Sequence, residues 1–399
     1  MKNFFVVLVL MLLIGCGGGG GVNGSSTGTN SSGGSSLPST NEGTNSSTVA
    51  TLISAKIACG YDHTLAVATD STVSSLGSNT YGQRGDGTII TSTNRSKVIG
   101  LSNIVSVAGG SRHSLALKSD GTVWAWGDNT YGQLGDGTTT SRLTPVHVAG
   151  LSNIVQIASN FNYSIALKND GTVWLWGYGY GNTAASMYNL SNVITVAAGR
   201  NHVLVLKKDG TVWSWGDNGS GQLGTGQSGM SLSLSNTPVK VIGLASVSKI
   251  AAGDSSSYAI KSDGTVWSWG YGTQLGVSGD LNQPYPLQVT SLAGIDSISS
   301  KEAMTYAMKR DAGIGSAFAW GEDRFGETGN SSFGSDVLLP VPISVIHNVV
   351  EIEAGFNHAV ALLSDGTIYG WGRSSSGQIG NYSPVTEFYA TPQLIQNFP

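Results

Sequence analysis

The sequence predicts an all-β fold, a seven-bladed β-propeller, and three observations carry that prediction. A slot made of an aromatic residue, a spacer, a second aromatic residue and a glycine recurs along the chain and holds all ten tryptophans. Its closing glycines are 50, 50, 39, 54, 51 and 51 residues apart, a period typical of repeat architectures. Glycine, with 57 residues in 399, is about twice as frequent as its usual share of roughly 7%, which favours short strands and tight turns. The seven copies end at Gly77, Gly127, Gly177, Gly216, Gly270, Gly321 and Gly372.

The second copy shows what one repeat builds. Residues 104–110 read as a strand that ends in glycines, and residues 113–118 and 122–126 alternate as two further strands. Asp120-Gly121 between them is a strong hairpin signal. Residues 145–148 form a short fourth strand. Each repeat is therefore predicted to be a four-stranded antiparallel sheet.

The alternation within these strands predicts how the sheets pack. Leu115 and Leu117 share one face of their strand, and Trp124 and Trp126 share one face of the next, with smaller residues between them. Sheets stacked radially bury a bulky side against a small-residue side and close on themselves. An open solenoid would need polar caps at both ends, and the sequence offers none.

Two copies and the C-terminal end depart from the pattern. The first copy has Asp70-Ser71 in place of Asp-Gly and lacks tryptophan. The third is short and predicts a three-stranded or reduced blade near residues 178–190. Residues 391–396 match the fourth-strand slot, and the sequence leaves open whether they complete the seventh blade or pair with the first.

The motifs of the repeat resemble those of the regulator of chromosome condensation 1 (RCC1) family. They are residues 113–117, Asp120-Gly121, residues 124–127 and Gly132-Gln133-Leu134-Gly135. The resemblance covers about residues 52–399 and implies an RCC1-type seven-bladed propeller. The founding member is a nuclear exchange factor for a small GTPase, and another member is a secreted bacterial inhibitor that grips β-lactamases. The family thus implies a rigid disc that presents loops to another protein, and no catalytic or partner-contact residue is carried over to this chain.

The N-terminus resembles that of a bacterial lipoprotein. Lys2 precedes an apolar run at residues 4–14, which has the length of a signal-peptide core and is too short for a membrane span of about 20 residues. Leu13-Ile14-Gly15-Cys16 then resembles a lipobox, which implies that residues 1–15 are removed as a signal peptide and that Cys16 is acylated, as with palmitate. An ordinary secretory signal and an uncleaved apolar start are the alternatives.

The segment after the cysteine is predicted to be a tether. Residues 16–50 are mainly Gly, Ser, Thr and Asn beyond the cysteine, with a single charge at Glu42, a composition that buries too little apolar surface to fold. Gly17 is not the aspartate that favours inner-membrane retention. We therefore expect a lipid-anchored envelope protein, in the outer membrane or at the cell surface if the host is Gram-negative, with its propeller at residues 51–399.

The search for chemistry in the sequence favours a scaffold over an enzyme. Four histidines recur at one repeat position, and three tyrosines are assigned to it in the other copies. A metal or acid–base ring is one interpretation, but exchange with tyrosine favours a polar aromatic that hydrogen-bonds across each blade. We predict no catalytic residue, no metal, no cofactor and no disulfide, with Cys59 a buried small residue. The repeat position is assigned to His63, His113, His202 and His358, and to Tyr163, Tyr258 and Tyr306.

Function is sought where the copies differ. The net charge of −4 and the lack of a Lys/Arg cluster argue against nucleic acid as a partner. Aromatic and arginine side chains on loops are typical interface anchors, so we predict an unknown protein partner for a monomeric propeller. A carbohydrate-binding module, with Tyr178 and Tyr180 stacking on sugars, is one alternative. Guanine-nucleotide exchange is another, which export disfavours, and loop drift without a role is a third. The candidate residues are Tyr178, Tyr180, Tyr188, Asp311, Arg324 and Phe325.

The lipid anchor can be tested directly. Cys16→Ala removes the acylated thiol, so the protein should leave the membrane fraction and appear in the soluble fraction of the same cells. Immunoblotting of both fractions measures the change, with Cys59→Ala as the matched control. Unchanged partitioning of Cys16→Ala would refute lipidation.

Overall fold

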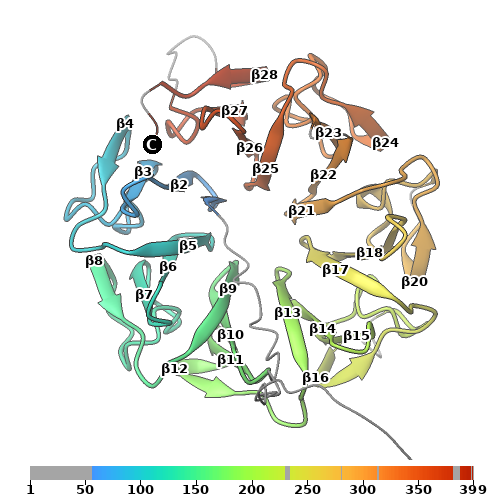
Figure 1. Ribbon diagram of the computed structural model, residues 1–399, viewed down its shortest axis with the longest axis horizontal. Coiled ribbons are helices and arrows are strands. Elements are labelled where there is room, and N and C mark those ends of the chain that lie inside the picture. The colour runs from blue at the N-terminus through green and yellow to red at the C-terminus, as the bar shows by residue number, and fades with distance from the viewer. Residues whose placement is uncertain are drawn as a thin grey trace, which may run out of the picture. The chain divides into compact units, whose positions relative to one another are not determined.

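Seven four-stranded antiparallel sheets stand around a central axis in the computed structural model (Figure 1). The structure describes residues 56–229, 234–279, 281–311, 314–380, 387–396 and 398. Each sheet is one blade made from consecutive strands, and the blades follow the chain from 1 to 7. The predicted all-β seven-bladed propeller is confirmed. The one helical element of the described ranges is the 3-10 turn η2 (Gly272–Gln274).

The strands of the first four blades are β1 (Ile57–Cys59), β2 (His63–Val67), β3 (Val73–Gly77) and β4 (Ser92–Lys97); β5 (Ile104–Gly109), β6 (His113–Lys118), β7 (Val123–Gly127) and β8 (Arg142–His147); β9 (Ile154–Asn160), β10 (Tyr163–Lys168), β11 (Val173–Gly177) and β12 (Gly181–Ser186); and β13 (Val193–Ala198), β14 (His202–Lys207), β15 (Val212–Asp217) and β16 (Leu234–Lys240). Those of the last three are β17 (Val247–Ala252), β18 (Ser256–Lys261), β19 (Val266–Gly270) and β20 (Gln283–Gln288); β21 (Ser297–Lys301), β22 (Met304–Asp311), β23 (Ile314–Gly321) and β24 (Val337–Pro342); and β25 (Val349–Ala354), β26 (His358–Leu363), β27 (Ile368–Arg373) and β28 (Phe388–Leu394).

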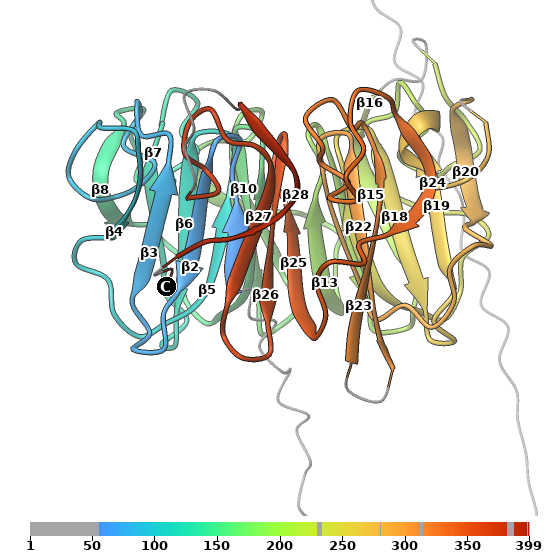
Figure 2. The ribbon, with the colours of Figure 1, turned by 90° about the horizontal axis from the view of Figure 1, so that it is seen from above.

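The ring of blades has two distinct faces. In each blade the first strand lies beside the axis and the fourth lies at the rim (Figure 1). Antiparallel connections fall at alternate ends of a sheet. The loops that join the first strand to the second and the third to the fourth therefore share one face, named here the mouth face. The hairpins between second and third strands lie on the opposite face, named the hairpin face, where the β22–β23 hairpin projects beyond the others (Figure 2).

The second tryptophan of each slot joins its blade to the preceding one. Trp126 of blade 2 is fully buried against Leu65 and Val73 of blade 1. Its indole N–H donates to the backbone carbonyl of Gln83, 2.8 Å away in a mouth-face loop of blade 1. The same bond recurs from Trp176 to Gln133 (2.8 Å), Trp269 to Gln222 (2.9 Å), Trp320 to Gln274 (2.8 Å) and Trp371 to Glu327 (2.7 Å).

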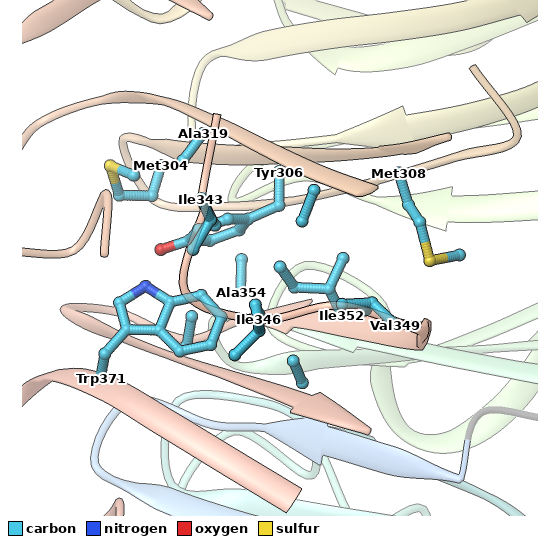
Figure 3. Close-up of a cluster of buried hydrophobic side chains, with 13 residues drawn as sticks. Met304, Tyr306, Met308, Ala319, Ile343, Ile346, Val349, Ile352, Ala354 and Trp371 are labelled. Atoms are coloured by element: carbon cyan, nitrogen blue, oxygen red, sulfur yellow. The ribbon is translucent and has the colours of Figure 1, made fainter. Parts of the chain in front are cut away.

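Apolar side chains from both partners fill the space around each of these tryptophans. Figure 3 shows the interface of blades 6 and 7, where Trp371 faces Tyr306. The two rings are edge to face, with centroids 5.8 Å apart and planes at 82°, a favourable aromatic geometry. The hydrophobic core is thus divided into clusters between neighbouring blades.

Of the two alternatives predicted near residues 178–190, a three-stranded blade or a reduced one, blade 3 is the reduced one, since it keeps four strands and has a shortened loop. Strand β12 pairs with β11, with Trp174 opposite Ser186 and Gly177 opposite Gly181. A sheet ladder needs only backbone N–H and C=O groups, so this segment serves without the proline that the fourth strands of blades 2, 4, 5, 6 and 7 contain. What the short repeat has lost is the long loop before its fourth strand, where Tyr178–Tyr180 is all that remains.

The lost loop is replaced at the next interface by Tyr180. Trp215 of blade 4 has no glutamine carbonyl to bond in blade 3, and its indole N–H donates to the Tyr180 hydroxyl at 3.2 Å. The Tyr180 ring also packs against Tyr163, with centroids 5.9 Å apart. Tyr180 therefore supports the fold, and its part in partner binding stays a prediction.

The ring closes without exchange of strands between its ends. β28 pairs with β27, so the C-terminal strand completes the seventh blade. Contacts between blades 7 and 1 then seal the ring. The Glu351 carboxylate accepts the backbone N–H groups of Lys56 (2.9 Å) and Ile57 (3.3 Å), and the Thr64 hydroxyl donates to the carbonyl of Gln378 at 2.6 Å.

The predicted signal peptide (1–15), Cys16 and the tether (16–50) lie outside the described residues. Within the part that the structure describes, no helix has the length and apolarity needed to cross a bilayer.

The tryptophan contact between blades can be tested by Trp176→Phe. The change keeps an aromatic ring but removes the N–H donor and part of the buried volume, so we expect a loss of about 1–3 kcal/mol in the free energy of unfolding. Chemical denaturation measures it. Trp174→Phe is the control, because that half-buried indole donates to Thr172 within its own blade. Equal losses in the two variants would contradict the assigned role.

Candidate functional site

The recurring histidines connect neighbouring blades and are not grouped as a metal or catalytic site. His63 Nε2 lies 3.0 Å from the Ser114 hydroxyl of the next blade. The same contact recurs between His113 and Ser164 (3.0 Å), His202 and Ser257 (2.9 Å), and His358 and Thr64 (3.2 Å). The predicted structural role is thus supported, although the bond runs between blades. Among the described residues no group of His, Cys, Asp and Glu side chains could hold a metal ion.

Two of the three tyrosines were assigned to the wrong repeat position. The strand register pairs Ser256 and Met304 with the closing glycines of their slots, so Tyr258 and Tyr306 lie two residues further along. Residues two apart share a face of a strand. The Tyr258 hydroxyl consequently reaches the same interface, where it accepts a hydrogen bond from Thr305 of the next blade at 2.8 Å.

The remaining candidates lie on both faces and do not meet in one site. Tyr178 is 51% exposed on the mouth face of blade 3, and Tyr188 is 80% exposed on the hairpin face. Asp311 ends β22 and pairs through its backbone with Ile314, also on the hairpin face. Arg324 and Phe325 follow β23 on the mouth face of blade 6. Loop variation in the sequence therefore does not itself locate a single surface.

The mouth face carries a set of side chains that loop length did not reveal. One position of each loop between the first and second strands holds six different residue types in the seven blades, with only phenylalanine used twice. We name this set the mouth ring. Its sequence signal was variability two residues before the histidine slot, a signal that the position between them shares. The members in blade order are Tyr61, Ser111, Phe161, Arg200, Asp254, Glu302 and Phe356.

The members of the mouth ring contact one another around the axis. The rings of Tyr61 and Phe356 have centroids 4.3 Å apart. The Arg200 guanidinium lies 4.7 Å from the centre of the Phe161 ring, within cation–π range. Arg200 also pairs with Asp254 at 3.4 Å and with Glu302 at 3.8 Å. Aromatic and charged groups from six of the seven blades thus converge at the end of the axis.

The carboxylates of the mouth ring are only partly neutralised. Burial raises the pKa of Glu302 to about 7, the neighbouring Asp254 adds to the rise, and the Tyr61 hydroxyl and Arg200 oppose it. Burial also raises the pKa of Asp254, against the opposing effect of Arg200. One guanidinium therefore does not fully offset two carboxylates on this part of the face.

A central cavity of about 520 Å³ runs along the first strands of the blades. Lys301, fully buried in blade 6, donates from Nζ to the carbonyls of Cys59 (2.6 Å) and Gly109, so that it links three blades across the axis. Burial raises the pKa of Glu353 to about 7, and its carboxylate accepts a hydrogen bond from Ser299 at 3.0 Å. The Cys59 thiol is buried and burial raises its pKa, consistent with a packing residue.

Beside the mouth ring, loops of blades 4 to 7 enclose a smaller cavity of about 310 Å³, named here the mouth pocket. Two mouth-ring carboxylates and the Phe356 ring contribute to it, together with three side chains of neighbouring loops. Its side walls come from segments more than 100 residues apart in the sequence. The principal lining residues are Asp254, Tyr271, Gln274, Glu302, Glu322 and Phe356.

Comparison with protein-family models finds the regulator of chromosome condensation (RCC1) repeat. One model of this repeat matches residues 55–83, 104–133, 193–222, 247–274 and 349–378. A second model of it matches residues 120–167 and 209–260. Together the matches reach six of the seven blades.

Among curated proteins, the ultraviolet-B receptor UVR8 of Arabidopsis thaliana is 30% identical over 153 residues, which are 37% of this chain and 34% of the receptor. The probable E3 ubiquitin-protein ligase HERC6 of Homo sapiens is 28% identical over 184 residues, 44% of this chain and 18% of the ligase. The similarity thus spans about a third or less of these relatives' length.

Two solved structures extend the likeness to the whole ring. Yeast RCC1 (Prp20), solved bound to Kap60, is 25% identical with a TM-score of 0.71 over 81% of this chain and 83% of that chain. Human WBSCR16 is 21% identical with a TM-score of 0.54 over 86% of this chain and 82% of that chain, which shows the fold alone.

The buried titratable groups predict that stability falls as the pH rises above about 6.5. Burial raises the pKa of Glu351 to about 8 and of Glu353 and Glu302 to about 7, so their favourable contribution to folding is complete below the ordinary pKa of 4.5 and is lost progressively as the pH rises through 7 to 8. Burial lowers the pKa of His113 to about 3 and of His202 to about 4, so their contribution is lost as the pH falls below 6.5. Melting temperatures across pH 4.5–9 measure both limbs.

Glu351→Gln should flatten the alkaline limb of that profile, whereas Glu387→Gln, at an exposed residue, should not. A melting temperature that still climbs toward pH 8 in the wild type would contradict the assignment.

Proposed function

Since the chain belongs to the regulator of chromosome condensation (RCC1) repeat family, we propose that it is a protein-binding propeller that a lipid on Cys16 holds at the cell envelope. The mouth face is its binding surface. The mouth ring is the observation that carries this proposal, because its residues vary at a position where no contact between blades requires a common residue.

Scaffold positions and mouth-ring positions differ in kind. The slot tryptophan repeats because it bonds the preceding blade, as Trp126 bonds Gln83. The mouth-ring position takes three aromatic residues, one arginine, two acids and a serine in seven blades, so no shared packing role selects its residue. Aromatic and arginine side chains are the usual anchors of protein interfaces. A ring of such groups on a rigid scaffold is suited to binding a protein partner.

The solved relatives support a protein partner. Yeast RCC1 (Prp20) was crystallised with Kap60, and Prp20p of Saccharomyces cerevisiae was studied for binding to Gsp1p and histones. The net charge of −4 disfavours nucleic acid for this chain. The lipobox-like residues 13–16 support the anchor at the envelope.

We propose binding and not catalysis. The histidines that could act as acid–base groups each bond a hydroxyl of the next blade, as His113 bonds Ser164. The founding family member is an exchange factor for a small GTPase, and an exported propeller would not meet such a GTPase.

Carbohydrate binding is the second candidate, and a pair of exposed tyrosines favours it. Tyr131 and Tyr178, at the rim of blades 2 and 3, lie edge to face with centroids 5.2 Å apart. Both rings are about half exposed, 46% and 51%, and could stack on a sugar.

Site-specific photo-crosslinking in cells tests the choice of face. A photoreactive aromatic amino acid replaces Arg112, exposed in a mouth-face loop, or Tyr188 on the hairpin face, in the full-length protein. We expect one discrete protein adduct from position 112, absent from position 188. Envelope background alone from position 112, or an adduct only from position 188, contradicts the proposal. Binding to a glycan array that is lost in Tyr178→Ala would instead favour the second candidate.

A further inference from the structure

The mouth pocket arises where one loop of blade 5 is shorter than its counterparts. Six positions separate Gly127 from Gln133 in blade 2, but four separate Gly270 from Gln274 in blade 5. The shorter loop turns through η2 and still places the backbone carbonyl of Gln274 against Trp320. The contact between blades is thus kept while the rest of the loop is rebuilt.

The rebuilt loop leaves the side chain of Gln274 without its usual partner. In the five other blades with this loop, the side-chain oxygen of the equivalent residue accepts the backbone N–H two residues earlier. In blade 5 that N–H belongs to Gly272 and is bonded to the side chain of Asn282 at 3.2 Å. Gln274 Oε1 therefore has no donor, although the residue is only 5% exposed. The equivalent bonds join Tyr81 to Gln83 (2.9 Å), Tyr131 to Gln133 (2.8 Å), Ser220 to Gln222 (2.9 Å), Phe325 to Glu327 (2.7 Å) and Ser376 to Gln378 (2.9 Å).

A second acceptor without a donor lies in the same pocket wall. Asp254 Oδ1 is buried and has no hydrogen-bond partner, while its other oxygen faces Arg200 at 3.4 Å. A buried acceptor left unpaired is unfavourable, because it has lost its hydrogen bonds to water and gained none in the protein. A hydrogen-bond donor that entered the pocket and reached these two oxygens would remove that penalty.

The charge of the mouth pocket favours a positively charged ligand. Three carboxylates line it, those of Asp254, Glu302 and Glu322. Arg200 pairs with the first two, and the third has Arg324 at 3.7 Å, whose side chain is 69% exposed and so screened by water. The pocket carries an excess of negative charge over its own cations, and the carboxylates are not arranged as ligands of a metal ion among the described residues.

We infer that the mouth pocket receives a basic side chain of the protein partner, arginine in preference to lysine. Its guest must carry positive charge, donate several hydrogen bonds and lie against the aromatic side chains of Tyr271 and Phe356. A guanidinium has five donors in a planar fork and stacks on aromatic rings, whereas an ammonium has three donors about one point. This inference rests on the proposed protein-binding role of the mouth face and names the chemistry that the partner presents there.

Matched pentapeptides test which side chain the mouth pocket binds. The probes are acetyl-Gly-Ser-X-Ser-Gly-amide with X as arginine, lysine or citrulline, which is the neutral counterpart of arginine. Titration calorimetry with the full-length protein should rank arginine above lysine, and citrulline at least about ten-fold weaker than arginine, a difference of about 1.4 kcal/mol. Equal binding of citrulline and arginine, or binding of Ca²⁺ without binding of the arginine peptide, would overturn the inference.

Variants tie that binding to the pocket. Glu302→Gln and Gln274→Leu should each weaken the arginine peptide several-fold, and Glu387→Gln, which removes an exposed charge outside the pocket, should not. Melting temperatures show whether each variant is folded. Unchanged affinity in both pocket variants overturns the inference.

The two proposals fail in different ways. A protein adduct from position 112 without binding of the arginine peptide removes this inference and leaves the proposed function. Specific binding of the arginine peptide without any protein adduct keeps the arginine-binding pocket and removes the proposed protein partner of the mouth face.

Discussion

The contact on which the ring depends is the indole of one blade set against the loop of the blade before it. Trp126 fills the space beside blade 1 and bonds the carbonyl of Gln83, and the Ser114 hydroxyl donates to the same carbonyl at 2.8 Å. Since His63 in turn bonds Ser114, apolar burial and a chain of hydrogen bonds act at one place. Each blade thereby fixes the mouth-face loop of its predecessor, and a satisfied buried network of this kind is specific in geometry.

Where the repeat lacks part of this contact, another group supplies it. Tyr180 gives Trp215 an acceptor in place of the lost loop. Tyr258 bonds Thr305 from two residues beyond the histidine position. The residues at these interfaces therefore vary while hydrogen bonds between neighbouring blades are kept, because an unpaired buried polar group is costly.

The same constraint explains where variation is free to serve binding. In blade 5 the backbone carbonyl of Gln274 remains bonded to Trp320, so the loop could shorten without loss of the interface. Only the side chain of Gln274 lost its partner, and the space beside it became the mouth pocket. Loops whose backbone is held by the next blade can change their side chains at little cost to the fold.

The sequence by itself determined the fold class, the number of blades and the position of most strands, because the tryptophan slot, the Asp-Gly hairpin and the period-two alternation are local patterns. It misplaced Tyr258 and Tyr306 by two residues, since the register of β18 and β22 is decided by their pairing with β19 and β23. It left open whether blade 3 was three-stranded or only reduced, and the fourth strand forms because any extended segment can supply the backbone ladder. The mouth ring and mouth pocket were decided by the tertiary structure alone. Their residues lie on loops of different blades, far apart in sequence, and they meet only because the ring closes.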